Sequence, residues 1–214
     1  GLAHAHFGWN LDKKVNHIAK YFLKNGYNSI LFGLQHVTYN EKRLGFKKIF
    51  PERPADAVVK NIRENIDSNL FKKPFYAEIN FFEPHRPFDF GGVKPYKSKG
   101  ISVPKYIPIN QDIKKEFASM QGAIKKMDDS VGKIINILKR TNLYENTIIL
   151  FTTDHGIPFP RAKGTLYDAG IETSLIISYP KLKIKNKKFK ELISNIDILP
   201  SLLDFAKIKI PKII

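Results

Sequence analysis

The stretch Asn146-Thr147-Ile148-Ile149-Leu150-Phe151-Thr152-Thr153-Asp154-His155-Gly156 decides the fold class of this chain. Its apolar run over 147–151 is continuous rather than alternating, which predicts a strand that is buried on both faces. A carboxylate, an imidazole and a glycine follow the run at once, and ligands commonly bind beyond the carboxyl ends of strands in open α/β sheets. The stretch therefore predicts an α/β protein with a functional site at the end of this strand.

The rest of the chain alternates between helical and strand-like patterns. Apolar residues at helical spacing predict helices over 11–25, 55–69, from Gln111 to near Asn142, and over 193–205. Short apolar runs predict further strands over 29–32, 75–82 and 173–178, with an irregular proline- and glycine-bearing segment over 88–109. This order predicts a mainly parallel sheet with helices on both faces, within a single domain over residues 1–214.

The composition limits the functional classes. The chain has 214 residues, 43% of them hydrophobic, which predicts a folded core. Its 36 Lys+Arg against 20 Asp+Glu give a formal charge of +16, which attracts anions such as nucleic acid, acidic polysaccharide, anionic lipid or small anionic esters. The lysines are scattered apart from short clusters such as 185–188, so a solvated lysine-rich surface is favoured over a dedicated polyanion site. No cysteine is present, which excludes a Cys nucleophile and thiolate metal ligands within these residues.

Three histidines follow three of the predicted strands. His36 ends the segment Gly33-Leu34-Gln35-His36, His85 lies in Glu83-Pro84-His85-Arg86-Pro87, and His155 follows Asp154. A single histidine is more often structural than functional, but three at equivalent strand ends favour a common site.

Charged neighbours give this predicted site its chemistry. Asp154 and His155 pair an oxygen ligand with an imidazole, and they either share a metal ion or form a simple turn at the aspartate. Arg161 and Lys163 add cations that could neutralise an anionic transition state. A histidine could protonate a departing oxygen or activate a nucleophile. The residues thus indicate a site for an anionic tetrahedral ester, without distinguishing sulfate from phosphate.

Five segments, in family order, resemble the sulfatase family of the alkaline-phosphatase superfamily. They lie at 26–36, 81–88, 146–156, 161–171 and 195–200, and the helix before the third of them resembles the family as well. The resemblance extends from about residue 11 to about residue 211, and the segments near residues 1–4 and 83–87 are most similar to the sulfamidase-like branch. It implies an alkaline-phosphatase-like domain of which residues 1–214 are a part.

The resemblance also implies roles for individual residues. Asp154 and His155 would bind a metal, usually calcium. Lys163 and His85 would contact the sulfate group, His85 would help the leaving oxygen, and Arg86 and Arg161 would add substrate contacts. His36 would lie near the nucleophile, which in the family is a formylglycine made from Cys or Ser in a C/S-x-P-x-R motif.

The chain departs from the family pattern at several points. It holds no C/S-x-P-x-R motif and no paired aspartates ahead of it, so both are expected upstream of Gly1. Leu34 stands where most members have a catalytic lysine. A chain without its nucleophile is expected to be inactive alone, as a fragment of a metal-dependent hydrolase acting on a sulfated sugar or aryl sulfate.

Two other functions fit the same residues. A phosphoesterase or phosphotransferase of the superfamily would carry two zinc ions, and His4 and His6 could line such a site. A non-catalytic polyanion-binding protein would suit the +16 charge, although no nucleic-acid motif is present. No apolar run approaches the about 20 residues of a transmembrane helix. Export is expected only from the family resemblance.

Overall fold

The computed structural model describes residues 4–96, 100–183 and 187–212. The chain separates into two compact units, each described here by itself. Unit 1 consists of the described parts of 1–53, 60–80 and 188–214, and unit 2 consists of the described parts of 54–59 and 81–187. Residues 185 and 186 of the lysine cluster at 185–188 lie outside the described residues.

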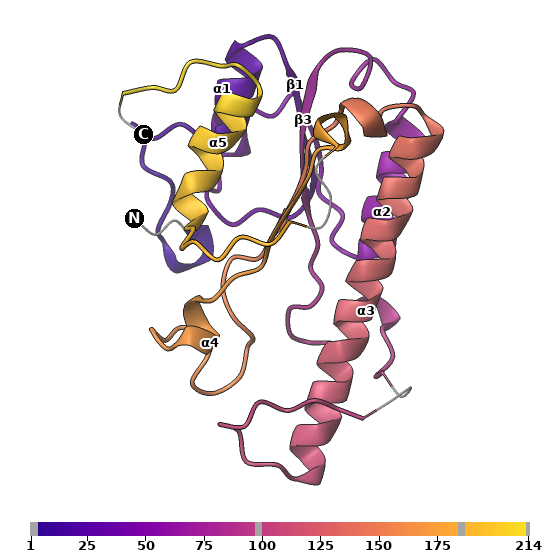
Figure 1. The fold of residues 1–214 in the computed structure, drawn as a ribbon, viewed down its shortest axis with the longest axis vertical. Coiled ribbons are helices and arrows are strands. Elements are labelled where there is room, and N and C mark those ends of the chain that lie inside the picture. The colour runs from indigo at the N-terminus through magenta and orange to yellow at the C-terminus, as the bar shows by residue number, and fades with distance from the viewer. Residues whose placement is uncertain (1–3, 97–99, 184–186, 213–214) are drawn as a thin grey trace. The chain divides into compact units, whose positions relative to one another are not determined.

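Unit 1 contains a parallel sheet. Its strand order is β2 (Lys48–Phe50), β1 (Asn28–Gly33), β3 (Phe75–Asn80), with Ile30 level with Lys48 and Gly33 level with Asn80. All six residues of the central strand β1 are buried, as its continuous apolar sequence predicts for a strand with neighbours on both edges. The carboxyl ends of β1 and β3 therefore lie side by side (Figure 1).

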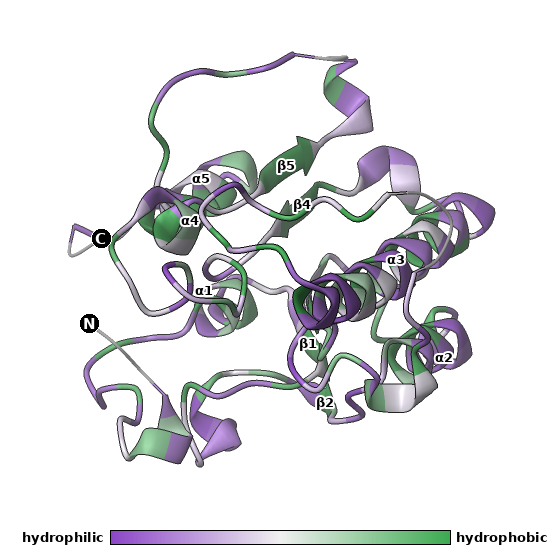
Figure 2. Ribbon diagram, turned by 90° about the horizontal axis from the view of Figure 1, so that it is seen from below, coloured by the Kyte–Doolittle hydropathy of each residue, from purple (hydrophilic) through white to green (hydrophobic). Residues whose placement is uncertain are grey.

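Two helices cover one face of this sheet. Phe22 of α1 (Ile18–Lys24) and Leu203 of α5 (Ile198–Phe205) form a buried cluster with Ile208, and Tyr76 of β3 packs against it. Phe22 and Tyr76 stack with ring centroids 4.9 Å apart. The apolar face of α5, seen in Figure 2, thus meets α1 and the sheet across one core.

Unit 2 is built on the long helix α3 (Gln111–Arg140), which Asn110 begins by accepting a hydrogen bond from the Ile113 N–H. Its core contains Phe117, Met120, Phe88 and Phe159. The strands β4 (Ile149–Thr152) and β5 (Leu175–Ser178) pair antiparallel, and the single-turn helix α4 (Asp168–Ile171) lies in the segment that joins them. The helix α2 (Ala55–Asn65) begins in unit 2.

Short 3-10 helices complete the described residues. They span Ala5–Phe7, Glu41–Arg43, Phe90–Gly92, Tyr144–Asn146, Pro180–Leu182 and Asn195–Asp197. No helix within the described ranges is long and apolar enough to cross a membrane.

The α/β class and the parallel sheet are confirmed, and several details differ from the sequence-based prediction. The first helix was expected from residue 11 but begins at Ile18, because Leu11 donates its N–H to Val37 instead of entering the helix. The strand β2 was not predicted, since three residues give too short a pattern. The strand β5 runs antiparallel to β4, because one helical turn and loops replace a crossover helix between them.

Candidate active site

His36 lies in unit 1, three residues after β1. Its ring lies 4.9 Å from the ring of His4 and 4.8 Å from that of His6, measured between centroids. Its carbonyl accepts a hydrogen bond from the Ala5 N–H at 2.6 Å. The structure therefore gathers three imidazoles at the carboxyl end of β1, and it includes the two that the sequence analysis assigned only to the zinc alternative.

His85 lies in unit 2, on an exposed loop that follows β3 along the chain. Its Nδ1 lies 2.5 Å from the Arg86 carbonyl oxygen, and its ring lies 5.1 Å from that of Phe82. Glu83 anchors the loop to α2. It is only 3% exposed, and its carboxylate accepts a hydrogen bond from the first N–H of α2, that of Ala55. His85 is thus presented to solvent from an anchored turn.

Arg86 joins the His85 loop to the segment after β4. Its guanidinium donates to the carboxylate of Glu116 on α3 and to the carbonyl of Pro158. It also lies over the rings of Phe88 and Phe159, at 4.6 and 4.9 Å from their centroids. Arg86 was expected to contact substrate, and in this structure all of these contacts are made within the protein.

Asp154 and His155 contact each other at the end of β4. The Asp154 Oδ2 and the His155 Nε2 are 3.1 Å apart, and the Asp154 Oδ1 accepts the His155 N–H. The Nδ1 of His155 lies 2.8 Å from the Gly156 carbonyl, to which it can donate. With Nδ1 as the donor, a neutral His155 ring would present the lone pair of Nε2 on the side of the carboxylate, which is the arrangement a metal-binding histidine needs.

The segment that carries Arg161 and Lys163 is hydrogen-bonded to the residues that follow β4. Lys163 donates its backbone N–H to the Ile157 carbonyl, and Gly156 donates to the Gly170 carbonyl of α4. A β-carbon on Gly156 would lie 1.7 Å from the Ala169 carbonyl oxygen, so only glycine permits this approach. The side chain of Lys163 is exposed, and Arg161 lies over the Tyr167 ring at 5.0 Å.

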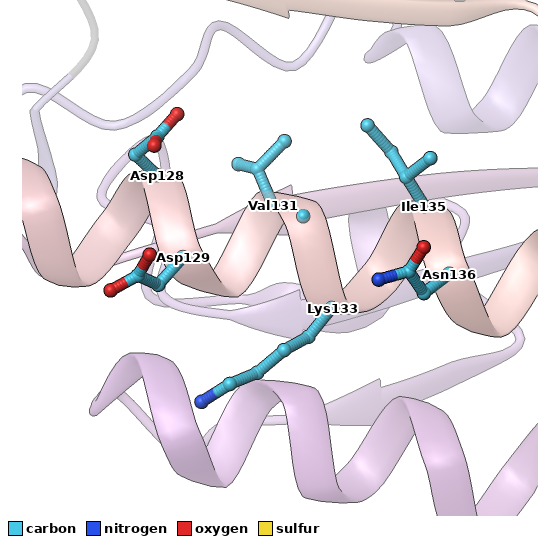
Figure 3. A pocket seen from close by; sticks show the side chains of 7 residues that line it. Asp128, Asp129, Val131, Lys133, Ile135 and Asn136 are labelled. Atoms are coloured by element: carbon cyan, nitrogen blue, oxygen red, sulfur yellow. The ribbon is translucent and has the colours of Figure 1, made fainter.

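Unit 2 contains six of the seven predicted site residues, on two loops that share one hydrogen bond. These are His85, Arg86, Asp154, His155, Arg161 and Lys163, and the Arg86 bond to Pro158 links the two loops. His36 belongs to unit 1. A separate depression on α3 holds none of them: Asp128, Val131 and Ile135 line it, while Lys133 extends to Asp56 of α2 at 3.4 Å (Figure 3).

The donors at the end of β4 fit part of a metal site. A carboxylate oxygen and an imidazole nitrogen 3.1 Å apart are spaced as two neighbouring ligands of one cation. Calcium takes six to eight oxygen-rich ligands, so these two groups would supply only a share of them. Within the part of the chain that the structure describes, no group of three or more His, Cys, Asp or Glu side chains could hold a metal ion.

Sequence reasoning missed the residues that support this site. Glu83 was quoted within the histidine motif but given no role, although a carboxylate between an apolar strand and a proline was a usable signal. Glu116 lies on α3, where charged residues normally face solvent, and nothing in its local pattern indicates a partner. Asn80 at the end of β3 contacts the Leu34 carbonyl, 46 residues earlier in the chain.

Comparison with known proteins gives the family. A family model described as "Sulfatase" matches residues 1–208. An ulvan-active sulfatase of Formosa agariphila is 36% identical over 107 residues, covering 50% of this chain and 18% of the relative. The human N-sulphoglucosamine sulphohydrolase is 26% identical over 163 residues, covering 65% of this chain and 32% of its own length.

Solved structures agree in fold. The yidJ protein of Bacteroides fragilis superimposes with a TM-score of 0.76 and 23% identity, covering 97% of this chain and 59% of that one. The chain spans about a fifth to a third of the length of these two curated relatives. Because the family model covers nearly all of its residues, this chain belongs to the sulfatase family.

Proposed function

We propose that this chain is part of the catalytic domain of a sulfuric ester hydrolase that acts on a sulfated sugar or an aryl sulfate. Family membership supports the reaction class, and relatives named as acting on ulvan and on N-sulphoglucosamine support a sugar substrate. The observation that carries the proposal is the linked pair of loops in unit 2, where a carboxylate, two imidazoles and two cations lie at strand ends.

Each side chain then has a physical role. Asp154 and His155 would hold a divalent cation, proposed to be calcium, which when bound would supply positive charge for a sulfate oxygen. Lys163 and Arg161 place positive charge near the remaining oxygens. His85 donates a proton to the departing oxygen, for which its exposed ring on an anchored loop is suited.

Other parts of the reaction fall to residues beyond these loops. His36 is proposed to lie near the nucleophile, a formylglycine that supplies the attacking oxygen and for which these 214 residues contain no C/S-x-P-x-R motif. The chain by itself is therefore proposed to be inactive. Arg86 is proposed to contact substrate through the part of its guanidinium that the bonds to Glu116 and Pro158 leave available.

The test is sulfate release by the complete, correctly matured protein from sulfated sugars and aryl sulfates. We expect the His85→Ala and Lys163→Ala variants to lose about 100- to 10,000-fold in kcat, as general-acid and charge-stabilising groups do. The exposed Lys114→Ala on α3 is the matched control and should keep wild-type rates. A chelator should abolish turnover, and added calcium should restore it.

Two results would contradict the proposal. Phosphate release faster than sulfate release, with two zinc ions per chain, would assign the protein to phosphoryl transfer. Binding of sulfated polymers without turnover, by a correctly matured protein, would make it a polyanion-binding protein.

A further inference from the structure

The loop that carries His36 is fastened to the end of β3 by one residue, Asn80. The Nδ2 of Asn80 donates to the Leu34 carbonyl at 2.8 Å, and its own carbonyl accepts the Leu34 N–H at 3.4 Å. Gly33 has a φ of +92°, and a β-carbon there would lie 1.8 Å from the Asn80 carbonyl oxygen. The two hydrogen bonds to Leu34 and the close contact with Gly33 thus fix the backbone where it leaves β1. Leu34 lies two residues before His36.

The side chain of Asn80 is itself held in one orientation. Its Nδ2 also donates to the Glu78 Oε1 at 2.9 Å, and an ionised carboxylate only accepts hydrogen bonds. The amide must therefore turn its NH2 group, rather than its oxygen, toward both Glu78 and the Leu34 carbonyl. Both N–H groups of the amide are used.

Glu78 is fixed in turn by two further groups on the same face. Tyr76, Glu78 and Asn80 alternate along β3, so all three side chains lie on the side that α1 covers. The Tyr76 hydroxyl donates to the Glu78 Oε2 at 2.9 Å, and the His17 Nε2 lies 3.7 Å from the same oxygen. His17 Nδ1 accepts the Ala19 N–H, which leaves its proton on Nε2, facing Glu78.

The side chains of His17, Tyr76, Glu78 and Asn80 are half-buried. Burial, and then the charge of Glu78, raise the pKa of Tyr76 well above its usual value. Hydrogen bonds in such surroundings are stronger, and a lost partner costs more, than at an exposed site. The chain of contacts from His17 through Glu78 and Asn80 to Leu34 is therefore a stiff support for the loop.

We propose that Asn80 is a positioning residue, which fixes the placement of His36 through the Leu34 carbonyl and is itself oriented by Glu78. The apolar side chain of Leu34 offers no hydrogen bond, so the Asn80 amide holds this end of the loop through the Leu34 backbone carbonyl. The expected effect on kcat rests on the proposed function, in which His36 acts beside the nucleophile. The expected effect on the loop at residues 34–39 does not depend on that function.

The chain provides a matched control at the other end of the same strand pair. The Nδ2 of Asn28 likewise makes two hydrogen bonds, in this case to the backbone carbonyls of Asn69 and Leu70, at 3.1 and 2.9 Å, and its Oδ1 accepts one from Lys47. Asn28 opens β1 while Asn80 closes β3, and the register places them at opposite ends of the sheet. Asn28→Ala should cost similar stability without moving His36.

The experiment compares Asn80→Ala, Asn80→Asp and Asn28→Ala in the complete protein. It measures kcat and KM on a sulfated sugar and amide hydrogen exchange of the peptide that spans residues 34–39. For both Asn80 variants we expect kcat to fall about 10- to 100-fold with KM changed less than about threefold, since misplacement of a reacting group by about 1 Å has effects of this size. Exchange in residues 34–39 should accelerate at least about tenfold. Asn28→Ala should change neither value.

Asn80→Asp adds a second test, the pH dependence of the activity loss, which a purely structural role of Asn80 would not change. It keeps the shape of asparagine but places a second carboxylate against Glu78, and protonation of one of them restores a donor. Its deficit relative to wild type at the same pH should therefore shrink as the pH falls toward about 4, where carboxyl groups take up a proton.

The outcomes separate the two proposals. Unchanged exchange in Asn80→Ala, or an equal loss of kcat in Asn28→Ala, would overturn the positioning role. Absence of sulfate release by the wild-type protein would overturn the proposed function, while the exchange data would still decide whether Asn80 holds the loop.

Discussion

At the scale of single residues, the imidazole of His17 makes the stability of unit 1 depend on pH. Its side chain is 16% exposed, it caps α1 by accepting the Ala19 N–H, and burial lowers its pKa despite the opposing effect of Glu78. A lowered pKa means that the folded state favours the neutral ring. The neutral ring of His17 therefore adds to the free energy of unfolding. This addition is fully present above the unfolded pKa of about 6.5 and is lost as the pH falls through the lower pKa of the folded state.

We therefore expect the melting temperature of the complete protein to fall between about pH 7.5 and about pH 5, and to fall less in a His17→Asn variant. Asparagine keeps a capping acceptor but does not titrate in this range. His6→Asn, at an exposed histidine, is the control and should retain the wild-type pH dependence. Identical pH profiles for wild type and His17→Asn would exclude His17 as the titrating group.

At the scale of elements, the start of α2 depends on a carboxylate from a distant loop. Glu83 is 3% exposed, and its two oxygens lie 3.1 and 3.2 Å from the Ala55 nitrogen. A negative charge beside the first N–H groups of a helix is stabilised by the helix dipole. Because His85 follows two residues later, the same contact sets the position of the His85 loop.

Glu83→Ala should lower the free energy of unfolding by about 1 to 3 kcal/mol, the cost of leaving a buried donor unpaired, and should also reduce kcat. Asn110→Ala removes the N-cap of α3 and should cost about 1 kcal/mol with kcat unchanged. Urea unfolding and sulfate release, measured on both variants, check this difference. A Glu83→Ala enzyme with the stability and kcat of wild type would show that α2 is capped in another way.

For the chain as a whole, the charge of +16 on these 214 residues should speed the capture of anionic substrates. We expect kcat/KM for a sulfated oligosaccharide to fall as salt rises from low concentration to about 0.3 M, because screening shortens the reach of exposed charges. The value of kcat should stay nearly constant, since bound substrate contacts its partners directly. A salt-independent kcat/KM would show that the positive charge does not guide the substrate.

Elements with strong local patterns were predictable from the sequence. The apolar runs of β1 and β4 and the helical spacing of α3 were placed within a few residues of their observed bounds, although β4, expected to be buried on both faces, is only half-buried. The short strand β2 and the first residues of the expected helix at 11–25 were not, because their conformations depend on pairing with β1 and with Val37. The spacing of apolar residues indicates which face of an element is buried. It does not indicate which distant backbone group an element bonds.

The same division applies to the candidate site. The sequence predicted candidate site residues and correctly placed His36, His85 and His155 after strands, since these are properties of neighbouring residues. The fold was needed to show that Arg86 pairs with Glu116, that Glu83 caps α2 and that Asn80 donates to the Leu34 carbonyl. Each of these contacts joins residues 28 to 46 positions apart, and the fold alone brings such partners within hydrogen-bonding distance.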